Sequence, residues 1–97
     1  MFLEIVTPEA ILFSSKVDLF SAPGVEGEFQ ILNNHAPIVS NLKEGQIKIY
    51  VHNQDHLVLD DLHAELKPSA DDAKVLTLAI KSGTLELKEN KAIILAD

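Results

Sequence analysis

The sequence predicts an all-β fold, either a sandwich or a small barrel, from three observations. Short segments in which apolar and polar residues alternate recur along most of the chain, as in half-buried strands. Residues that favour turns, mainly Gly, Pro, Asn and Asp, separate these segments. The chain has 97 residues, which is the size of one domain with one core, so we expect a single domain over residues 1–97.

The alternation defines eight expected strands. They are residues 2–6, 11–20, 28–32, 38–42, 46–51, 75–80, 84–88 and 92–95. Within 11–20 we expect Ile11, Phe13, Val17 and Leu19 to share the buried face with Ser15. Residues 21–24 are expected to form a loop, and the last three strands to form a meander of hairpins.

Residues 52–74 interrupt this pattern. Leu57 to Leu59 are compatible with a strand, whereas Leu59, Leu62 and Leu66 have the spacing of a short amphipathic helix over residues 60–67. The segment is therefore either an extended hairpin or a short helix, and the sequence leaves both open.

Composition disfavours several classes of function. The net charge is −7 and all eight basic residues are lysine, which disfavours nucleic acid binding because phosphates are repelled and no arginine fork is present. The absence of cysteine excludes disulfides, thiolate nucleophiles and sulfur-bound zinc. No apolar run approaches the roughly 20 residues of a membrane-spanning helix, and no export signal is recognisable, so we expect a soluble protein that is not exported.

Candidate catalytic and ligand-binding groups are weakly supported. His35 lacks a nearby serine in a nucleophile motif, and Gly24 with Gly27 lacks the third glycine and the lysine of a phosphate-binding loop. A cluster with metal-ligand chemistry occurs at His52, Asp55, His56, Asp60, Asp61 and His63. Its residues favour a solvated loop over a metal site. We therefore expect no catalytic residue, no nucleotide site, no metal and no cofactor.

Residues 23–37 are the most individually specified stretch, and they resemble the signature of the epsilon subunit of F-type ATP synthases, called delta in mitochondria. The matching residues are Leu3-Glu4-Ile5-Val6-Thr7-Pro8, Leu12-Phe13-Ser14, Pro23-Gly24, Gly27-Glu28-Phe29, Ile31-Leu32, His35-Ala36-Pro37, Leu42-Lys43-Glu44-Gly45, Gly83-Thr84-Leu85-Glu86-Leu87 and Leu95-Ala96-Asp97. The resemblance covers residues 2–51 and about 80–97, in the order of the family's N-terminal domain.

The resemblance implies a ten-stranded β-sandwich that acts as a non-catalytic rotor subunit in the central stalk. Its partners would be the gamma subunit and the membrane-embedded c-ring. Gly27, Glu28 and Phe29 would contact the ring; the stalk contact would be made by His35, Ala36 and Pro37, with Thr7 and Ser40 as further candidates. The resemblance also implies a monomer when isolated, held at the cytoplasmic face of the bacterial inner membrane only through the complex.

Three departures from the family pattern accompany the resemblance. Gln30 replaces a common glycine, and Asn33-Asn34 replace a common Pro-Gly; asparagine tolerates the left-handed backbone region, so the turn is expected to survive. The family's C-terminal helical hairpin has no counterpart, so we expect no inhibition by those helices. The alternative interpretation is a stand-alone β-sandwich module that binds a peptide or carbohydrate, although Tyr50 and four phenylalanines offer few aromatic contacts.

Overall fold

The structure, a computed structural model, describes residues 1–51, 67–68 and 75–97, and these residues form ten strands. The strands are β1 Phe2–Val6, β2 Ile11–Lys16, β3 Leu19–Gly24, β4 Gly27–Leu32, β5 Ile38–Leu42, β6 Gly45–Tyr50, β7 Lys67–Pro68, β8 Val75–Ile80, β9 Gly83–Lys88 and β10 Lys91–Ala96. Across the described part of the chain, no helix is long and apolar enough to cross a membrane.

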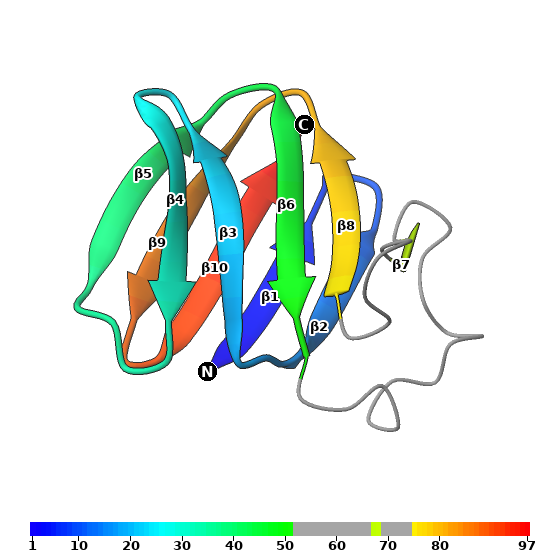
Figure 1. The fold of residues 1–97 in the computed structure, drawn as a ribbon. Coiled ribbons are helices and arrows are strands. Elements are labelled where there is room, and N and C mark those ends of the chain that lie inside the picture. Colours follow the sequence, from blue (N-terminus) through cyan, green and yellow to red (C-terminus); the bar gives the residue numbers. More distant parts are fainter. Residues whose placement is uncertain (52–66, 69–74) are drawn as a thin grey trace.

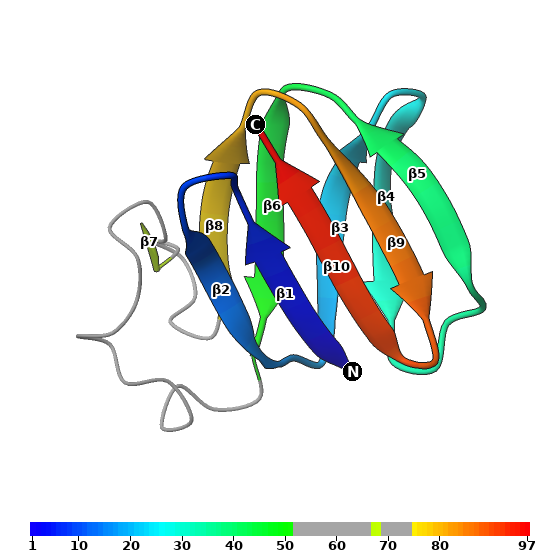
Figure 2. The same cartoon turned by 180° about the vertical axis from the view of Figure 1, so that it is seen from behind.

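The strands form two layers, which confirms the expected β-sandwich (Figures 1 and 2). One layer contains β4, β3, β6, β8 and β7, and the other contains β2, β1, β10, β9 and β5. The layers are joined at one side by a single pair, Gly24 of β3 with Leu42 of β5. Every other described pairing is antiparallel except that of β1 with β10, which is parallel.

The core lies between the two layers and is built from the inward positions of each strand. Ile47 and Ile49 of β6 have exposed fractions of 0%, as the period of two predicts. On the facing layer Leu85 and Leu87 of β9 are equally buried, at 0% and 1%. On β4 the same alternation buries Ile31 and packs Phe29 against the core.

The expected strand over 11–20 is wrong in two respects. It consists of two strands, β2 and β3, which lie in different layers, so the chain crosses the core at Val17 and Asp18. The register also shifts where Ile5 pairs with Phe13 and Val6 with Ile11, so Leu12 is the extra residue of a bulge. Consequently Leu12 and Phe13 are both buried, whereas Ile11, expected inside, is 64% exposed.

Two other expectations need correction. Residues 21–24 are not a loop but the last four residues of β3, and each of them pairs with a residue of β4. The three C-terminal strands are not one meander, because β8 pairs with β6 while β9 pairs with β5 and β10. Only β9 and β10 form the expected hairpin, and the β8–β9 turn carries the chain from one layer to the other (Figure 1).

The prediction for residues 52–74 lies largely outside the described residues. Of the expected helix range the structure describes only Lys67, which belongs to β7 and pairs with Thr77 of β8. The cluster at His52, Asp55, His56, Asp60, Asp61 and His63 lies entirely outside the described residues.

Candidate functional site: the β3–β4 hairpin and the two ends of the sandwich

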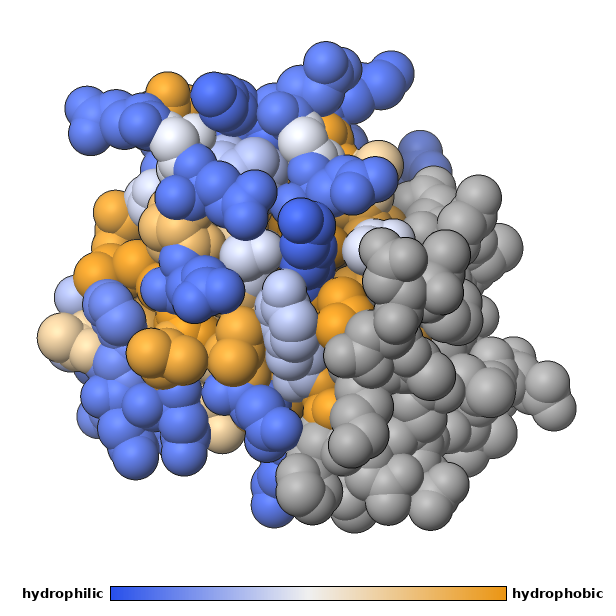
Figure 3. All heavy atoms as spheres, in the orientation of Figure 1, coloured by the Kyte–Doolittle hydropathy of each residue, from blue (hydrophilic) through white to orange (hydrophobic). Residues whose placement is uncertain are grey.

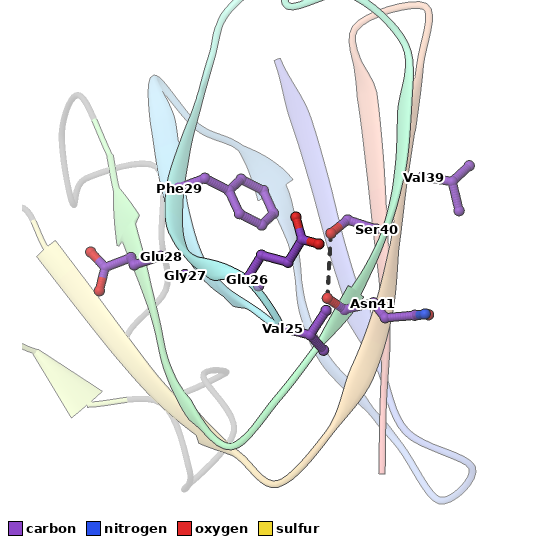
Figure 4. Close-up of a pocket in the computed structure, with 9 residues that line it drawn as sticks. Val25, Glu26, Gly27, Glu28, Phe29, Val39, Ser40 and Asn41 are labelled. Carbon is purple, nitrogen blue, oxygen red and sulfur yellow. Dashed lines mark hydrogen bonds between the residues drawn. The ribbon is translucent and has the colours of Figure 1, made fainter.

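The β3–β4 hairpin presents the residues expected to contact the ring at one end of the sandwich. Val25 and Glu26 form its two-residue turn, and Gly27 and Glu28 begin β4 as exposed residues. Gly27 has a φ of 135°, a conformation that glycine adopts without steric cost. Glu28 points away from the β5 side of the strand, which leaves its carboxylate free to meet a partner (Figure 4).

Gly24 shapes the same hairpin by leaving room for an aromatic ring. A Cβ at Gly24 would lie 2.7 Å from Cε1 of Phe29 and 2.8 Å from the carbonyl oxygen of Gly27. Such distances are far inside van der Waals contact, so no larger residue fits without movement. The Phe29 ring therefore lies over the Gly24 backbone and leans toward β5.

A hollow of about 490 Å³ lies between the hairpin and β5. It is lined by residues 24–29 and by Val39, Ser40 and Asn41 (Figure 4). In the space-filling view, apolar residues gather over the β4 and β5 side of the molecule, with hydrophilic residues above and below them (Figure 3). Two of the most exposed apolar residues belong to these strands: Leu32 is 54% exposed and Val39 is 79% exposed.

Ser40, expected at the stalk contact, lines this hollow together with the three residues expected at the ring contact. Its hydroxyl donates to the carbonyl oxygen of Asn41 at 3.3 Å. The structure therefore brings Gly27, Glu28, Phe29 and Ser40 around one surface.

His35, Ala36 and Pro37 lie at the opposite end of β4, in the exposed link to β5 (Figures 1 and 2). The backbone N–H of His35 donates to the carbonyl oxygen of Leu32 at 3.1 Å. Nδ1 of His35 lies 2.7 Å from the carbonyl oxygen of Ala36, so the ring is held close to its own backbone.

An amide cluster fixes this link to the neighbouring hairpin. Asn90, in the β9–β10 turn, accepts from the backbone N–H of Asn34 at 2.8 Å and donates to the Asn33 side chain at 2.9 Å. The N-terminal amino group donates to the same Asn33 oxygen at 2.9 Å. Asn34 has a φ of 64°, which confirms the expectation that asparagine adopts the left-handed conformation in this turn.

Thr7 follows β1 in the β1–β2 turn, and this turn lies at the same end of the sandwich as the β3–β4 turn (Figures 1 and 2). Its hydroxyl oxygen accepts from the backbone N–H of Glu9 at 3.3 Å and of Ala10 at 3.1 Å. The backbone N–H of Thr7 also donates to the carbonyl oxygen of Ala10 at 2.8 Å. Thr7 thus closes the β1–β2 turn through its own side chain.

Thr7→Ala is expected to lower the free energy of unfolding by about 1 kcal/mol, because the N–H of Glu9 loses its acceptor and the N–H of Ala10 keeps only the carbonyl oxygen of Thr7, at 3.4 Å. Thr7→Ser keeps the hydroxyl and is the matched control, so its urea midpoint is expected near the unsubstituted value. Equal midpoints for Thr7→Ala and the unsubstituted chain would show that the hydroxyl contributes nothing to the turn.

Several residues of this surface carry weak sequence signals. Val39 and Asn41 are the outward residues of β5. The sequence signal at Val39 was an apolar residue on an otherwise polar face of the strand. The pairing of Asn33 with Asn90 joins positions 57 apart in sequence, for which the chain offered no sign. Among the residues that the structure describes, no group of three or more His, Cys, Asp or Glu could hold a metal ion.

Comparison with known proteins places this geometry in a family. Residues 1–70 match the sequence profile of the ATP synthase delta/epsilon chain β-sandwich domain. The ATP synthase epsilon chain of Desulforamulus reducens is 33% identical over 95 residues, which are 98% of this chain and 57% of that one. The epsilon chain of Chlorobaculum tepidum is also 33% identical, with 98% and 86% of the two chains covered.

Solved structures agree on the fold. The chain superposes with a TM-score of 0.72 on a chain of the Euglena gracilis mitochondrial ATP synthase structure that contains OSCP, F1 and the c-ring. The identity is 14%, over 97% of this chain and 48% of the other. A chain of the Tetrahymena thermophila mitochondrial ATP synthase central stalk and c-ring gives a TM-score of 0.68 at 13% identity, over 98% and 61% of the chains.

The chain spans 57% of the length of the Desulforamulus relative and 86% of the Chlorobaculum relative. Sequence profile, identity and fold converge on the part of these proteins that forms the sandwich. The chain belongs to the ATP synthase delta/epsilon family and corresponds to its β-sandwich domain.

Proposed function

We propose that this chain is a rotor subunit of an F-type ATP synthase that joins the gamma subunit to the c-ring so that both turn together. The observation that carries the proposal is its relationship to ATP synthase epsilon chains over 98% of its length. The epsilon chain is a non-catalytic subunit, and catalysis takes place in other subunits of the complex. In this proposal residues 1–97 act as one domain, monomeric in isolation and held at the cytoplasmic face of a bacterial inner membrane through the complex alone.

The two ends of the sandwich provide two separate contact surfaces in this proposal. Glu28, beside the turn at one end, pairs with basic groups of the ring loops. His35, Ala36 and Pro37, exposed at the other end, contact the stalk. Ser40 and Thr7 do not lie with them, so a stalk contact that includes all five residues would run along the length of the sandwich.

A rigid body suits this role, because a part that transmits torque must not deform between its two contacts. The paired layers and the amide cluster around Asn33 and Asn90 hold both surfaces on one framework. The net charge of −7 favours partner surfaces that carry lysine or arginine.

A change of charge at each surface, a reversal at Glu28 and an added negative charge at His35, tests these assignments separately. Glu28→Lys is expected to reduce co-purification with the ring by about tenfold or more while retaining gamma, because a favourable charge pair becomes repulsive. His35→Glu is expected to reduce co-purification with gamma and to retain the ring. Both side chains are exposed, so neither variant is expected to unfold.

The matched controls place the same charge changes elsewhere on the described surface. Glu86→Lys on β9 and Gln46→Glu on β6 alter exposed residues outside both contact surfaces, and both are expected to assemble normally. Unchanged assembly of Glu28→Lys and His35→Glu would contradict the site assignments. Failure of the unsubstituted chain to bind either partner would contradict the function.

A further inference from the structure

β4 has an open edge. It pairs with β3 along its full length and with no other strand among those that the structure describes. The next strand in the chain, β5, joins the opposite layer through β9 and reaches β3 only at Leu42. The hollow between residues 24–29 and 39–41 lies along this open seam.

The register identifies the backbone groups that face the seam. The two-residue turn makes Gly24 and Gly27 a hydrogen-bonded pair, and such pairs alternate along an antiparallel ladder. Phe29 and Ile31 therefore bond to β3, whereas the N–H and C=O groups of Glu28 and Gln30 point away from it. Leu32 confirms this phase, because its carbonyl oxygen accepts from His35 on the outer side at 3.1 Å.

β5 offers matching groups from the other side of the seam. The carbonyl oxygen of Asn41 points toward the hairpin, since it accepts from the N–H of Val25 at 3.2 Å. By the same alternation, the N–H and C=O of Val39, two residues earlier, face away from β9 and toward the seam. An extended segment placed here would find backbone partners along β4 and at β5.

The β4 edge lacks the features that usually prevent strand addition. Edge strands are commonly protected by lysine, proline or a bulge. β2, the edge strand of the other layer, has both Lys16 and a bulge at Leu12. β4, with the sequence GEFQIL, has no lysine, no proline and a regular register.

We propose that the open edge of β4 accepts an extended, lysine- or arginine-bearing segment of a protein partner as an added strand. The charge beside the seam selects this partner chemistry, because Glu26 lines the hollow, Glu28 carries a second carboxylate on the outer face of β4, and none of the described residues that line the hollow is basic. Main-chain hydrogen bonds to Glu28 and Gln30 provide the binding, and the two carboxylates favour basic side chains at alternate positions. This inference rests on the proposed function, because that function makes another rotor subunit the source of the segment.

Amide hydrogen exchange measured by NMR on this 10.6 kDa chain tests the proposal at single residues. Two probes are used: the purified gamma and c-ring, and a synthetic eight-residue peptide in which lysine and valine alternate. The amides of Glu28 and Gln30 are expected to exchange fast in the free chain and about tenfold or more slowly with either probe. The amides of Phe29 and Ile31, already bonded to β3, serve as internal controls and are expected to change little.

A pair of variants separates main-chain from side-chain binding. Gln30→Pro removes an N–H that points away from β3, so the β3–β4 ladder is retained. Gln30→Ala keeps the N–H and is the matched control. The proline variant is expected to bind the peptide about tenfold more weakly than the alanine variant, a difference of about 1.4 kcal/mol.

The outcomes distinguish this inference from the proposed function. In one outcome the chain assembles with gamma and the c-ring, the amides of Glu28 and Gln30 still exchange fast, and the two variants bind the peptide equally well. This outcome overturns the added strand and leaves the rotor function intact. Slow exchange at these amides in the dilute free chain also overturns it, because the edge would then already be covered. Protection by the peptide without assembly supports the added strand and contradicts the rotor function.

Discussion

Phe20→Ala is expected to lower the free energy of unfolding by about 3–5 kcal/mol, the largest effect of any single substitution considered for this chain. Phe20 is 0% exposed and sits in β3, paired with Ile31 of β4 and Ile49 of β6. Removing its aromatic ring leaves a cavity beneath β3, β4 and β6. The cavity does not close, because the rest of the sandwich holds these strands in place. A domain of this size has roughly 5–15 kcal/mol of stability, so the variant retains a fraction of it.

Urea unfolding followed by circular dichroism measures this effect through the shift in midpoint at constant slope. Phe2→Ala is the control, because Phe2 is only partly buried and its ring faces the Lys91 amino group at 5.7 Å from the ring centroid. Its expected loss is about 1 kcal/mol or less. Equal losses for the two variants would mean that the space between the layers is not the main source of stability.

Gly24→Ala is expected to lower the free energy of unfolding by about 1–3 kcal/mol, because its methyl group would overlap Phe29 and the Gly27 carbonyl. The strain falls on the hairpin that carries Glu28, the proposed contact with the c-ring. The variant is therefore also expected to bind the c-ring more weakly. The measurements are urea unfolding and co-purification with the ring.

A double-mutant cycle with Phe29→Leu identifies the cause. The smaller, flexible leucine removes the overlap between the aromatic ring of Phe29 and a methyl group at position 24. The stability lost through Gly24→Ala is therefore expected to shrink by about 1 kcal/mol in the Phe29→Leu background. Gly27→Ala is the comparison: a Cβ there meets nothing within 4 Å, and its cost arises from the φ of 135° alone. Phe29→Leu should therefore leave the loss from Gly27→Ala unchanged. Additive losses of stability in both cycles would show that overlap with the aromatic ring of Phe29 is not the cause of the Gly24→Ala effect.

Alternation predicted the strands well and their partners poorly. Ile47 and Ile49, or Leu85 and Leu87, are buried as a period of two requires, because that pattern depends only on local geometry. At Val17 and at Ser82 the chain passes from one layer to the other without leaving a distinctive pattern. The bulge at Leu12 shifts by one residue which side chains of β2 point into the core. Ile11, predicted to be buried, is therefore exposed.

The sequence proposes the residues of the candidate site but not how they are arranged. Gly27, Glu28 and His35 stood out by the resemblance to the family signature, and Asn34 adopts the left-handed conformation that its residue type allows. That Ser40 faces the same hollow as Phe29 depends on the pairing of β5 with β9, which joins segments more than 40 residues apart. Such long-range pairing is set by the packing of the whole sandwich and leaves no local signature.

The most direct test of the rotor assignment is to mix the tagged, unsubstituted chain with purified gamma and c-ring and to measure what it retains. If the chain is a rotor subunit, both partners are recovered with it in one assembly, and omission of the chain greatly weakens the recovery of gamma with the c-ring. Recovery of neither partner, at concentrations where the chain is folded, would contradict the rotor assignment.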